Sequence, residues 1–454
     1  MEHRVKNSIT EGVIWKEMIL FLIPIFLQSV FQQVFGIADA IIVGQGVGKY
    51  ALGAINSTSN LTRLFLNLFL GFCSGSAIVV SQGWGAENPD RVRRAVHTGM
   101  AFSLTGGLLT ALICVPATPL FMKLMQIPAD MLPYSQIYTR IIYVSFIGVF
   151  IYDMAAAILR AIGDSKRPFY YLIAAMLLNV VLDLAFVLVF RWGVAGAAAA
   201  TAVSQMAAAL LAVRRLCRAD NAARLTLKDV RFDPKTLREI TRLGVPMGIS
   251  GILFSISNIT IQSTVNSLGT DVLTGWGVNN KICSLIWSMF ETFAIAASTF
   301  VAQNYGAGKL DRVRKTIRTC FALESAVIVP VSVMLYVFVR PLSRLFINDE
   351  AVMNYAVLAN HVMVPFYFVY LFGDLFGASI RGTGETLRPM LITLVGICGF
   401  RVVWIVAIHL VSAPTVLNVA VSYPASWIFN SALMTLYFFF GRWRSRLREP
   451  EAAQ

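Results

Sequence analysis

Charged residues are scarce in this chain. Asp, Glu, Lys and Arg make up 14% of its 454 residues, whereas soluble proteins carry roughly 25%. Hydrophobic residues make up 57%, and apolar stretches recur along the whole length, each long enough to cross the ~30 Å hydrocarbon core of a bilayer. The composition therefore excludes an ordinary soluble domain and predicts an all-α polytopic membrane protein.

Several chemical signals are also missing. The six cysteines have no paired spacing and the four histidines no metal-ligand spacing, which argues against disulfide and metal sites. No glycine-rich phosphate loop with its lysine, nucleophile elbow or ATP-binding domain occurs. The polar, basic start of the chain shows no cleavage pattern of a signal peptide. We therefore predict a protein that is not an enzyme, has no cofactor and draws energy from an ion gradient.

The last third of the chain repeats its first third at an offset of 221 residues. A Gln-x-x-Gly-Ala segment at 82–86 returns in related form at 303–307, and an Arg-x-x-Gly segment at 160–163 returns at 381–384. Because both halves keep these segments, we interpret them as architecture that ends helices. Two copies of one unit in so apolar a chain indicate a transporter with two lobes around a central path.

Twelve membrane spans are predicted. Their approximate ranges are 17–43, 51–82, 93–117, 134–160, 168–191, 194–215, 238–268, 273–304, 314–338, 355–380, 388–410 and 415–440. Most of the 38 Lys and Arg residues lie at the N-terminus, in loops after even-numbered spans and in the C-terminal tail. By the positive-inside rule both termini are then cytoplasmic, and the net charge of +14 needs no nucleic-acid partner.

Six spans per half make the two copies parallel, related by a pseudo-twofold axis along the membrane normal. We predict an N-terminal lobe at 1–215 and a C-terminal lobe at 238–441, each with six spans. A cytoplasmic linker at 216–237 joins them, and a basic cytoplasmic tail follows at 442–454. The expected location is the cytoplasmic (inner) membrane of a prokaryote.

Two acidic residues occur inside spans of one half only. Asp39 in span one has its counterpart near Ile261, and Asp183 in span five has Trp404. An aspartate at mid-helix costs about 2.5–3.5 kcal/mol on insertion scales, so an acid that the duplicated fold does not require suggests function. Asn179 lies one helical turn before Asp183. We predict an ion pocket made by Asp39, Asn179 and Asp183, with two unrelated packing acids as the alternative.

Further polar residues could line a path through the first lobe. Gln28 and Gln32 share a stripe of span one with Asp39. A second polar face runs along span two, where it consists of Asn56, Asn60, Arg63 and Asn67. Amides facing lipid are costly, so this face is expected to line a wet cavity. Pairing of Arg63 with Asp39 is a weaker hypothesis, because Arg63 lies deeper in the membrane.

The second lobe carries its own charged candidates. Lys281 and Glu291 lie in span eight, and an intramembrane pair between them could be structural or could line the path. Asp374 in span ten is duplicated as Asp153, which favours a structural role for both. The role of Arg401 in span eleven is left open.

Taken together, the motifs resemble the multidrug and toxic compound extrusion (MATE) family of secondary transporters over about 15–440. The resemblance rests on Asp39–Gly44, both Gln-x-x-Gly-Ala segments, both Arg-x-x-Gly segments, Asn179–Asp183, Gly193–Ala198 and Ala200–Thr201. It implies two six-helix lobes that export small cationic or amphipathic organic compounds in exchange for protons or sodium. It also implies an ion site at Asp39, Asn179 and Asp183, with Gln32 and Thr201 lining the first-lobe pocket.

Two questions stay open at this point. Protons need one carboxylate, whereas sodium needs several oxygens, and the residues allow either ion with a preference for protons. The alternative function is a lipid-linked oligosaccharide flippase of the same broad superfamily, which would want a strongly cationic cavity built from residues such as Arg63, Lys281 and Arg401. In either case the expected partners are small molecules and membrane lipid, with no obligatory protein partner.

Overall fold

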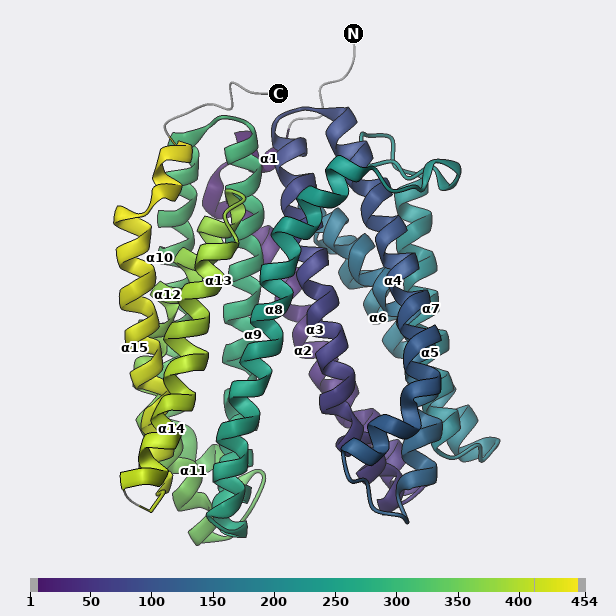
Figure 1. Ribbon diagram of the computed structural model, residues 1–454, viewed down its shortest axis with the longest axis vertical. Coiled ribbons are helices and arrows are strands. Elements are labelled where there is room, and N and C mark those ends of the chain that lie inside the picture. The colour runs from purple at the N-terminus through teal and green to yellow at the C-terminus, as the bar shows by residue number, and fades with distance from the viewer. Residues whose placement is uncertain (1–6, 412, 448–454) are drawn as a thin grey trace. The chain divides into compact units, whose positions relative to one another are not determined.

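The computed structural model describes residues 7–411 and 413–447, and all regular elements in these ranges are helices (Figure 1). Eleven helical stretches there are long and apolar enough to cross a membrane. The first eleven predicted spans each coincide with one of them, and the predicted span 415–440 coincides with α15 (Val416–Phe440). The predicted all-α polytopic fold is confirmed.

The chain forms two compact units. The N-terminal unit is Ile23–Gly248. Its elements are α2 (Ile14–Gly46) from Ile23 onward, α3 (Lys49–Gly85), α4 (Pro89–Leu124), α5 (Leu132–Ala161), α6 (Lys166–Asp183), the π-helix η1 (Leu184–Val189), α7 (Val194–Cys217), η2 (Leu227–Asp229) and the start of α8 (Pro234–Ser267).

The C-terminal unit combines the chain up to Leu22 with the chain from Ile249 onward. Besides α15 and its shares of α2 and α8, its elements are α1 (Ser8–Glu11), α9 (Thr270–Gly306), α10 (Leu310–Arg344), α11 (Glu350–Met363), η3 (Val364–Phe366), α12 (Tyr367–Gly382), α13 (Leu387–Thr393), the π-helix η4 (Leu394–Gly399), α14 (Phe400–Val411) and η5 (Arg442–Leu447).

The unit boundaries differ from the predicted lobes at 1–215 and 238–441. Residues before Ile23 belong to the C-terminal unit, and the first part of α8 belongs to the N-terminal unit together with the predicted linker 216–237. The reason is that α2 and α8 are continuous helices, so each passes from one unit into the other without a loop. Loop positions in the sequence give no sign of such a boundary.

The duplicated motifs end helices, as predicted. Helix α3 ends at Gly85, where the Ala86 N–H donates to the carbonyl oxygen of Gln82. Helix α9 ends at Gly306, where the Ala307 N–H donates to the carbonyl oxygen of Gln303. The two halves therefore turn at equivalent points by the same backbone hydrogen bond.

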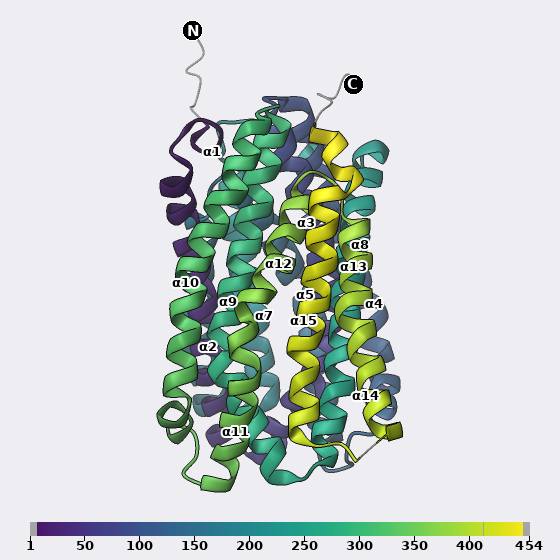
Figure 2. The same cartoon turned by 90° about the vertical axis from the view of Figure 1, so that its left-hand side faces the viewer.

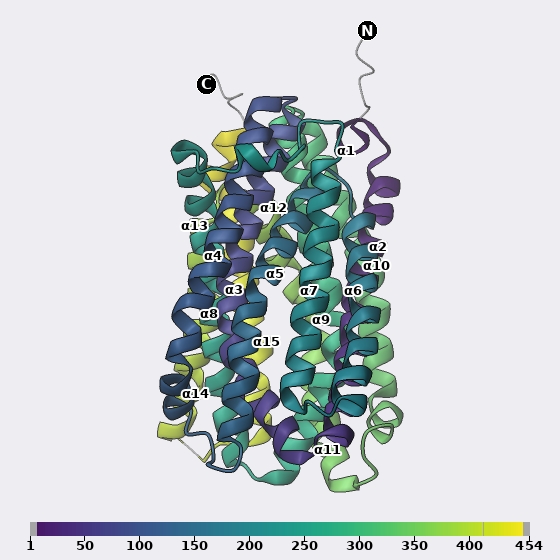
Figure 3. The same ribbon diagram turned by 90° about the vertical axis from the view of Figure 1, so that its right-hand side faces the viewer.

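Helix α5 is the centre of the N-terminal unit, where it packs against α3, α4 and α7 (Figure 3). The rings of Phe69 on α3 and Phe150 on α5 stack with centroids 3.8 Å apart. In the C-terminal unit, α9 packs against α10, α11 and α12, and α12 packs against α15. Helices α5 and α9 are thus each packed against three other long helices of their own unit.

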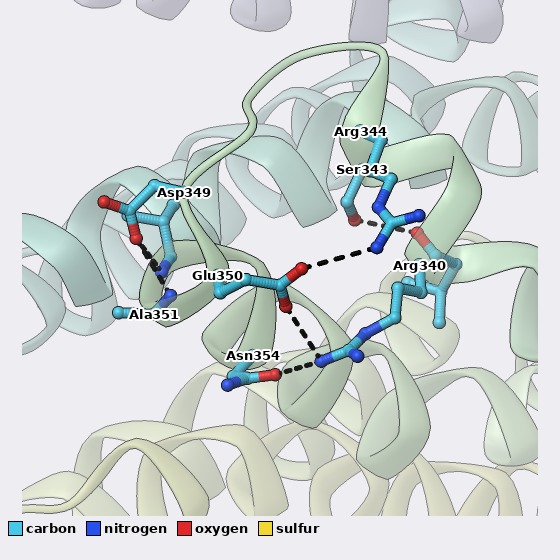
Figure 4. Close-up of polar contacts among 9 residues, drawn as sticks. Arg340, Ser343, Arg344, Asp349, Glu350, Ala351 and Asn354 are labelled. Carbon is cyan, nitrogen blue, oxygen red and sulfur yellow. Dashed lines mark hydrogen bonds and ion pairs between the residues drawn. The ribbon is translucent and has the colours of Figure 1, made fainter.

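Polar contacts fix both ends of the long helices in the C-terminal unit. Near the chain start, the Arg312 guanidinium donates to the carbonyl oxygens of Ile9 (2.9 Å) and Gly12 (2.7 Å), which holds α1 against α10. At the opposite end, Glu350 pairs with Arg340 and Arg344, each at 3.4 Å (Figure 4). These contacts restrain the segment between α10 and α11.

Candidate functional site: a buried carboxyl pair

The carboxyl groups of Asp39 and Asp183 lie within hydrogen-bonding reach of each other inside the N-terminal unit. Asp39 comes from α2 and is half-buried, whereas Asp183 comes from the end of α6 and is fully buried. One oxygen of each group, Oδ1, is buried and has no hydrogen-bond partner among the residues that the structure describes. The predicted meeting of these two acids is therefore present in the structure.

Asn179 and Thr201 complete the polar cluster. With its amide oriented to satisfy its neighbours, Asn179 donates to Asp183 Oδ2 at 3.3 Å and accepts from the backbone N–H of Thr201 at 3.2 Å. The Thr201 hydroxyl donates to the Ala197 carbonyl oxygen at 3.1 Å. Asn179 thus ties α6 to α7 and directs its amide nitrogen toward the acid pair.

Local backbone structure explains how Asp183 comes to be buried. It is the last residue of α6 and immediately precedes the π-helix η1, whose wider turn shifts the residues that follow. A small apolar cluster that includes Val43, Val187, Val194 and Ala197 packs beside the site. This apolar cover limits water around the carboxyls and strengthens electrostatic interactions within the cluster.

The structure does not bring the other predicted first-lobe residues to the acid pair. Gln28 is half-buried and Gln32 is exposed, and within the described residues neither is hydrogen-bonded to Asp39 or Asp183. Arg63 is exposed and forms no ion pair with either acid in the described part of the chain, so its hypothesised pairing with Asp39 is absent. The side chains of Asn56 and Asn60 lie outside the described residues.

The predicted Lys281–Glu291 pair is also absent. Both residues lie on α9, ten positions apart, which separates them by about 15 Å along the helix axis. The Lys281 ammonium instead lies 5.9 Å from the centroid of the Phe346 ring. Their spacing along α9 therefore excludes a direct ion pair between Lys281 and Glu291.

Asp374 lies on α12 near the guanidinium of Arg381, and its duplicate Asp153 on α5 lies near Arg160. The two halves thus repeat an acid and an arginine as neighbours on one helix. This arrangement agrees with the structural role that the duplication favoured.

Arg401 occupies the interior of the C-terminal unit. Its side chain is 1% exposed, its Nε donates to Ser426 Oγ at 3.0 Å, and its Nη1 donates to Asn258 Oδ1 at 3.3 Å. The guanidinium lies 4.1 Å from the centroid of the Tyr423 ring. Among the described residues this buried arginine is held by neutral groups, without a carboxylate partner, and its Nη2 has no hydrogen-bond partner.

Sequence reasoning missed two residues. Tyr138 on α5 lies close enough to Asp39 and Asp183 for its hydroxyl to interact electrostatically with both carboxyl groups. Glu324 on α10 is fully buried, and neither carboxyl oxygen has a hydrogen-bond partner. The counterpart of Glu324 in the first half is Ser103, so the criterion that singled out Asp39 and Asp183 would also have found this acid.

These features define a class of protein. The fold is a polytopic helical membrane protein with an internal repeat, and the N-terminal unit holds a carboxyl pair, Asp39 and Asp183, that forms no ion pair with a cation in the described part of the chain. No group of three or more His, Cys, Asp and Glu side chains in the described residues is arranged to hold a metal ion. Such an arrangement is that of an ion-coupled membrane transporter.

Comparison with known proteins identifies the family. The model of the MatE family matches residues 24–185 and 246–406, which is more than half of the chain. The chain therefore belongs to the MatE family of membrane transporters, which are not enzymes. The two matched segments correspond to the two halves of the predicted internal repeat.

The similar proteins include two bacterial relatives. The chain is 30% identical to the "Probable multidrug resistance protein YoeA" of Bacillus subtilis over 451 residues, which cover 97% of this chain and 96% of the relative. It is 26% identical to the "Probable multidrug resistance protein NorM" of Thermotoga maritima, with 95% and 93% covered.

Solved structures show the same fold. An outward-facing multidrug resistance MATE family transporter of the MOP superfamily superposes with a TM-score of 0.88 at 20% identity, covering 98% of this chain and 99% of that one. A MOP superfamily transporter from Pyrococcus furiosus, described by a reversed polarity of its binding pocket, gives a TM-score of 0.87 at 21% identity with the same coverage.

Proposed function

We propose that this protein is a secondary exporter of small organic, often cationic compounds, and that Asp39, Asn179 and Asp183 form its ion-coupling site. It would work in the cytoplasmic membrane of a prokaryote with both termini in the cytoplasm, as the distribution of Lys and Arg predicts. Membership in the MatE family and the multidrug resistance names of two relatives support export of such compounds.

The observation that carries the proposal is the carboxyl pair. Two ionised carboxylates repel each other, and each can only accept hydrogen bonds, so a bond between them requires a proton on one. Burial of Asp183 and the apolar cluster beside it increase the cost of two negative charges. The pair is therefore a site where one proton is held between two acids and titrates as a unit.

Proton binding can drive alternating access through this pair. A proton loaded from outside removes a negative charge from the cluster and weakens its attraction for an organic cation. If the protonated and deprotonated clusters prefer different conformations, the proton gradient shifts the population between them in proportion to that preference. Release of the proton to the cytoplasm then restores the charge that attracts the next cation.

The orientation of Asn179 supports protons over sodium. Sodium in a transporter is coordinated by oxygen atoms. When the Asn179 amide is oriented to satisfy both neighbours, its nitrogen faces Asp183 and its oxygen accepts from the Thr201 N–H. The cluster therefore directs a donor at the carboxyl pair, which stabilises a negative charge left after a proton leaves.

The test uses purified protein in proteoliposomes loaded with ethidium, with a proton gradient and a sodium gradient imposed separately. We expect wild-type transport to follow the proton gradient. Asp183→Asn and Asp39→Asn each remove a proton-binding group while keeping a similar shape. Each should reduce the rate of proton-driven transport at least about a hundredfold, which corresponds to a loss of roughly 2.7 kcal/mol of coupling free energy.

Asp220→Asn is the matched control, since it removes one negative charge from an exposed position in the loop after α7. It should transport at the wild-type rate. Wild-type transport by both site variants would refute the assignment of the coupling site, and transport driven by sodium alone would refute proton coupling. Elution as a single monodisperse peak shows that a variant is folded.

The roles of Gln28, Gln32, Arg63 and Thr201 in binding the exported compound remain predictions, as do those of Lys281, Glu291 and Asp374. The flippase alternative draws support from one feature, the buried guanidinium of Arg401. Lys281, which that alternative also needs, is exposed and faces an aromatic ring. The acid pair in the N-terminal unit is better suited to cations than to a pyrophosphate.

A further inference from the structure

The C-terminal unit contains a cavity of about 650 Å³ that is separate from every residue considered above. Its lining residues come from the start of α10, the end of α15, α12 and η5. The start of α10 and the end of α15 lie at the same end of the unit, which is the upper end in Figure 2. Since α10 follows the short turn after α9, the Lys and Arg distribution predicts that this end of the unit is at the cytoplasmic surface.

Aromatic side chains form the wall of the cavity. Those that line it are Phe321, Phe372, Phe376, Phe438, Phe439 and Trp443. The rings of Phe376 and Phe438 stack with centroids 4.1 Å apart, and the Trp443 indole N–H donates to the Phe438 carbonyl oxygen at 2.8 Å. These contacts hold the aromatic wall in place, because each ring is fixed by another ring or by the backbone.

Ile317 and three arginines complete the lining, and no described Asp or Glu belongs to it. Arg444 donates to the Phe439 carbonyl oxygen at 2.6 Å, which anchors its side chain beside the aromatic wall. Arg314 is paired with Asp311 at a loose 3.4 Å, and both side chains are largely exposed. Arg318 has no ion pair among the described residues. The cavity therefore combines three cationic side chains with an apolar interior.

We propose that this cavity binds an anionic phospholipid of the cytoplasmic leaflet. The phosphate would lie among Arg314, Arg318 and Arg444, and an acyl chain would lie against the aromatic wall. Basic pockets between membrane helices on the cytoplasmic side have the chemistry that recognises anionic headgroups, whereas a zwitterionic headgroup gains no net attraction from three arginines. The level of the cavity at the end of the helices matches the level of lipid headgroups.

The duplicated half offers a comparison within the same chain. At the offset of 221 residues, Phe372 and Phe376 correspond to Ile151 and Ala155, and Phe438 corresponds to Cys217. The aromatic wall is therefore not required by the repeated fold. Like Asp39 and Asp183, the aromatic wall is present in one half of the repeat and missing from the other. This difference argues that it serves a ligand rather than packing alone.

Native mass spectrometry of the full chain in detergent tests the proposal, with dioleoylphosphatidylglycerol or dioleoylphosphatidylcholine added at equal concentrations. Wild-type protein should retain phosphatidylglycerol and not phosphatidylcholine. Each Arg→Gln change at 314, 318 or 444 should weaken retention about fivefold, as expected for about 1 kcal/mol per basic side chain near an anionic lipid. The triple variant should lose retention.

The matched control removes three exposed cations from the N-terminal unit by Lys166→Gln, Arg218→Gln and Lys235→Gln. It should retain phosphatidylglycerol like the wild type. Equal loss in this control would show that overall charge, not the cavity, binds the lipid, and equal retention of both lipids would also overturn the proposal. So would displacement of the lipid by an equal concentration of inorganic phosphate, since the aromatic wall would then contribute nothing.

Should the triple variant fail to fold, the single Arg318→Gln variant decides the question, because Arg318 has no ion pair to lose. Its retention of phosphatidylglycerol should fall about fivefold, and unchanged retention would overturn the assignment. The outcome is independent of the proposed coupling site, because transport driven by protons and lipid retention at the cavity are measured separately.

Discussion

A double-mutant cycle on Asp39 and Asp183 measures the interaction on which the proposed coupling depends. The variants are Asp39→Ala, Asp183→Ala and the double variant. Each single change removes one carboxyl and leaves the other buried without its hydrogen bond, whereas the double change removes both. If the two groups share a hydrogen bond, the double variant is therefore less destabilised than the sum of the single variants.

The expected coupling energy follows from the chemistry of the pair. One partner is a carboxyl and the other a carboxylate, and hydrogen bonds to charged groups contribute about 1.5–3 kcal/mol. The fully buried position of Asp183 favours the upper part of this range, since the surroundings screen the interaction little. A coupling of this size corresponds to a factor of roughly 10–150 in the folding equilibrium constant.

The assay is reversible unfolding in mixed micelles with increasing dodecyl sulfate, followed by tryptophan fluorescence. A control cycle pairs Asp39→Ala with Asp153→Ala, because Asp153 is a half-buried acid of the same unit whose charged neighbour is Arg160 rather than Asp39. Changes at sites without shared partners add within about 0.3–0.5 kcal/mol. A coupling below about 0.5 kcal/mol for Asp39 and Asp183 would refute the shared proton.

Two further predictions concern packing and pH. Gly275→Ala on α9 should destabilise the protein by about 1–3 kcal/mol, because the added Cβ would lie 2.6 Å from the Val352 carbonyl oxygen. Gly277→Ala on the same helix meets open space and should be neutral or slightly stabilising, so equal thermal stability of the two variants would contradict this packing. Asp233 caps α8 by accepting from the Thr236 N–H and hydroxyl, and these hydrogen bonds lower the pKa of Asp233 from 3.8. The contribution of Asp233 to the free energy of unfolding is therefore present above the pKa that Asp233 has in the unfolded chain. It is lost as the pH falls through the lower pKa of Asp233 in the folded protein. Asp233→Ala should cost about 1 kcal/mol near neutral pH in thermal unfolding, with the difference from wild type shrinking below pH 4.

The fold could be predicted from sequence because its main signals are local. Apolar length predicts each span, and the glycines at Gly85 and Gly306 end helices through contacts within a few residues. The unit boundaries could not be predicted in this way. They fall inside α2 and α8, where the helix continues and only tertiary packing assigns residues to one unit or the other.

The candidate site was predictable in part, for a related reason. Asp39 and Asp183 are singled out because an acid inside an apolar span is costly, whatever surrounds it, and Asn179 because it lies one helical turn before Asp183. Tyr138 was missed because a tyrosine in a span carries no such cost and becomes informative only when packing places it beside the carboxyls. The pairing of Arg63 with Asp39 was wrong because a shared polar face on one helix does not fix the distance to another.

The two halves also differ in part of their internal charge, although both keep an aspartate near an arginine on α5 and on α12. Arg401 on α14 bonds Asn258 on α8, and its counterpart in the first half is Val180 on α6, within one turn of Asp183. Equivalent helices thus carry a buried cation, Arg401, in one unit and a buried acid, Asp183, in the other. Since the repeated backbone accommodates both, the fold does not dictate the sign of the charge. A buried ion without a partner of opposite sign costs several kcal/mol, so each of these charges lowers the stability of the unit that contains it. We propose that each of these charges interacts with an ion or a substrate group of opposite charge, which the folded chain alone does not supply.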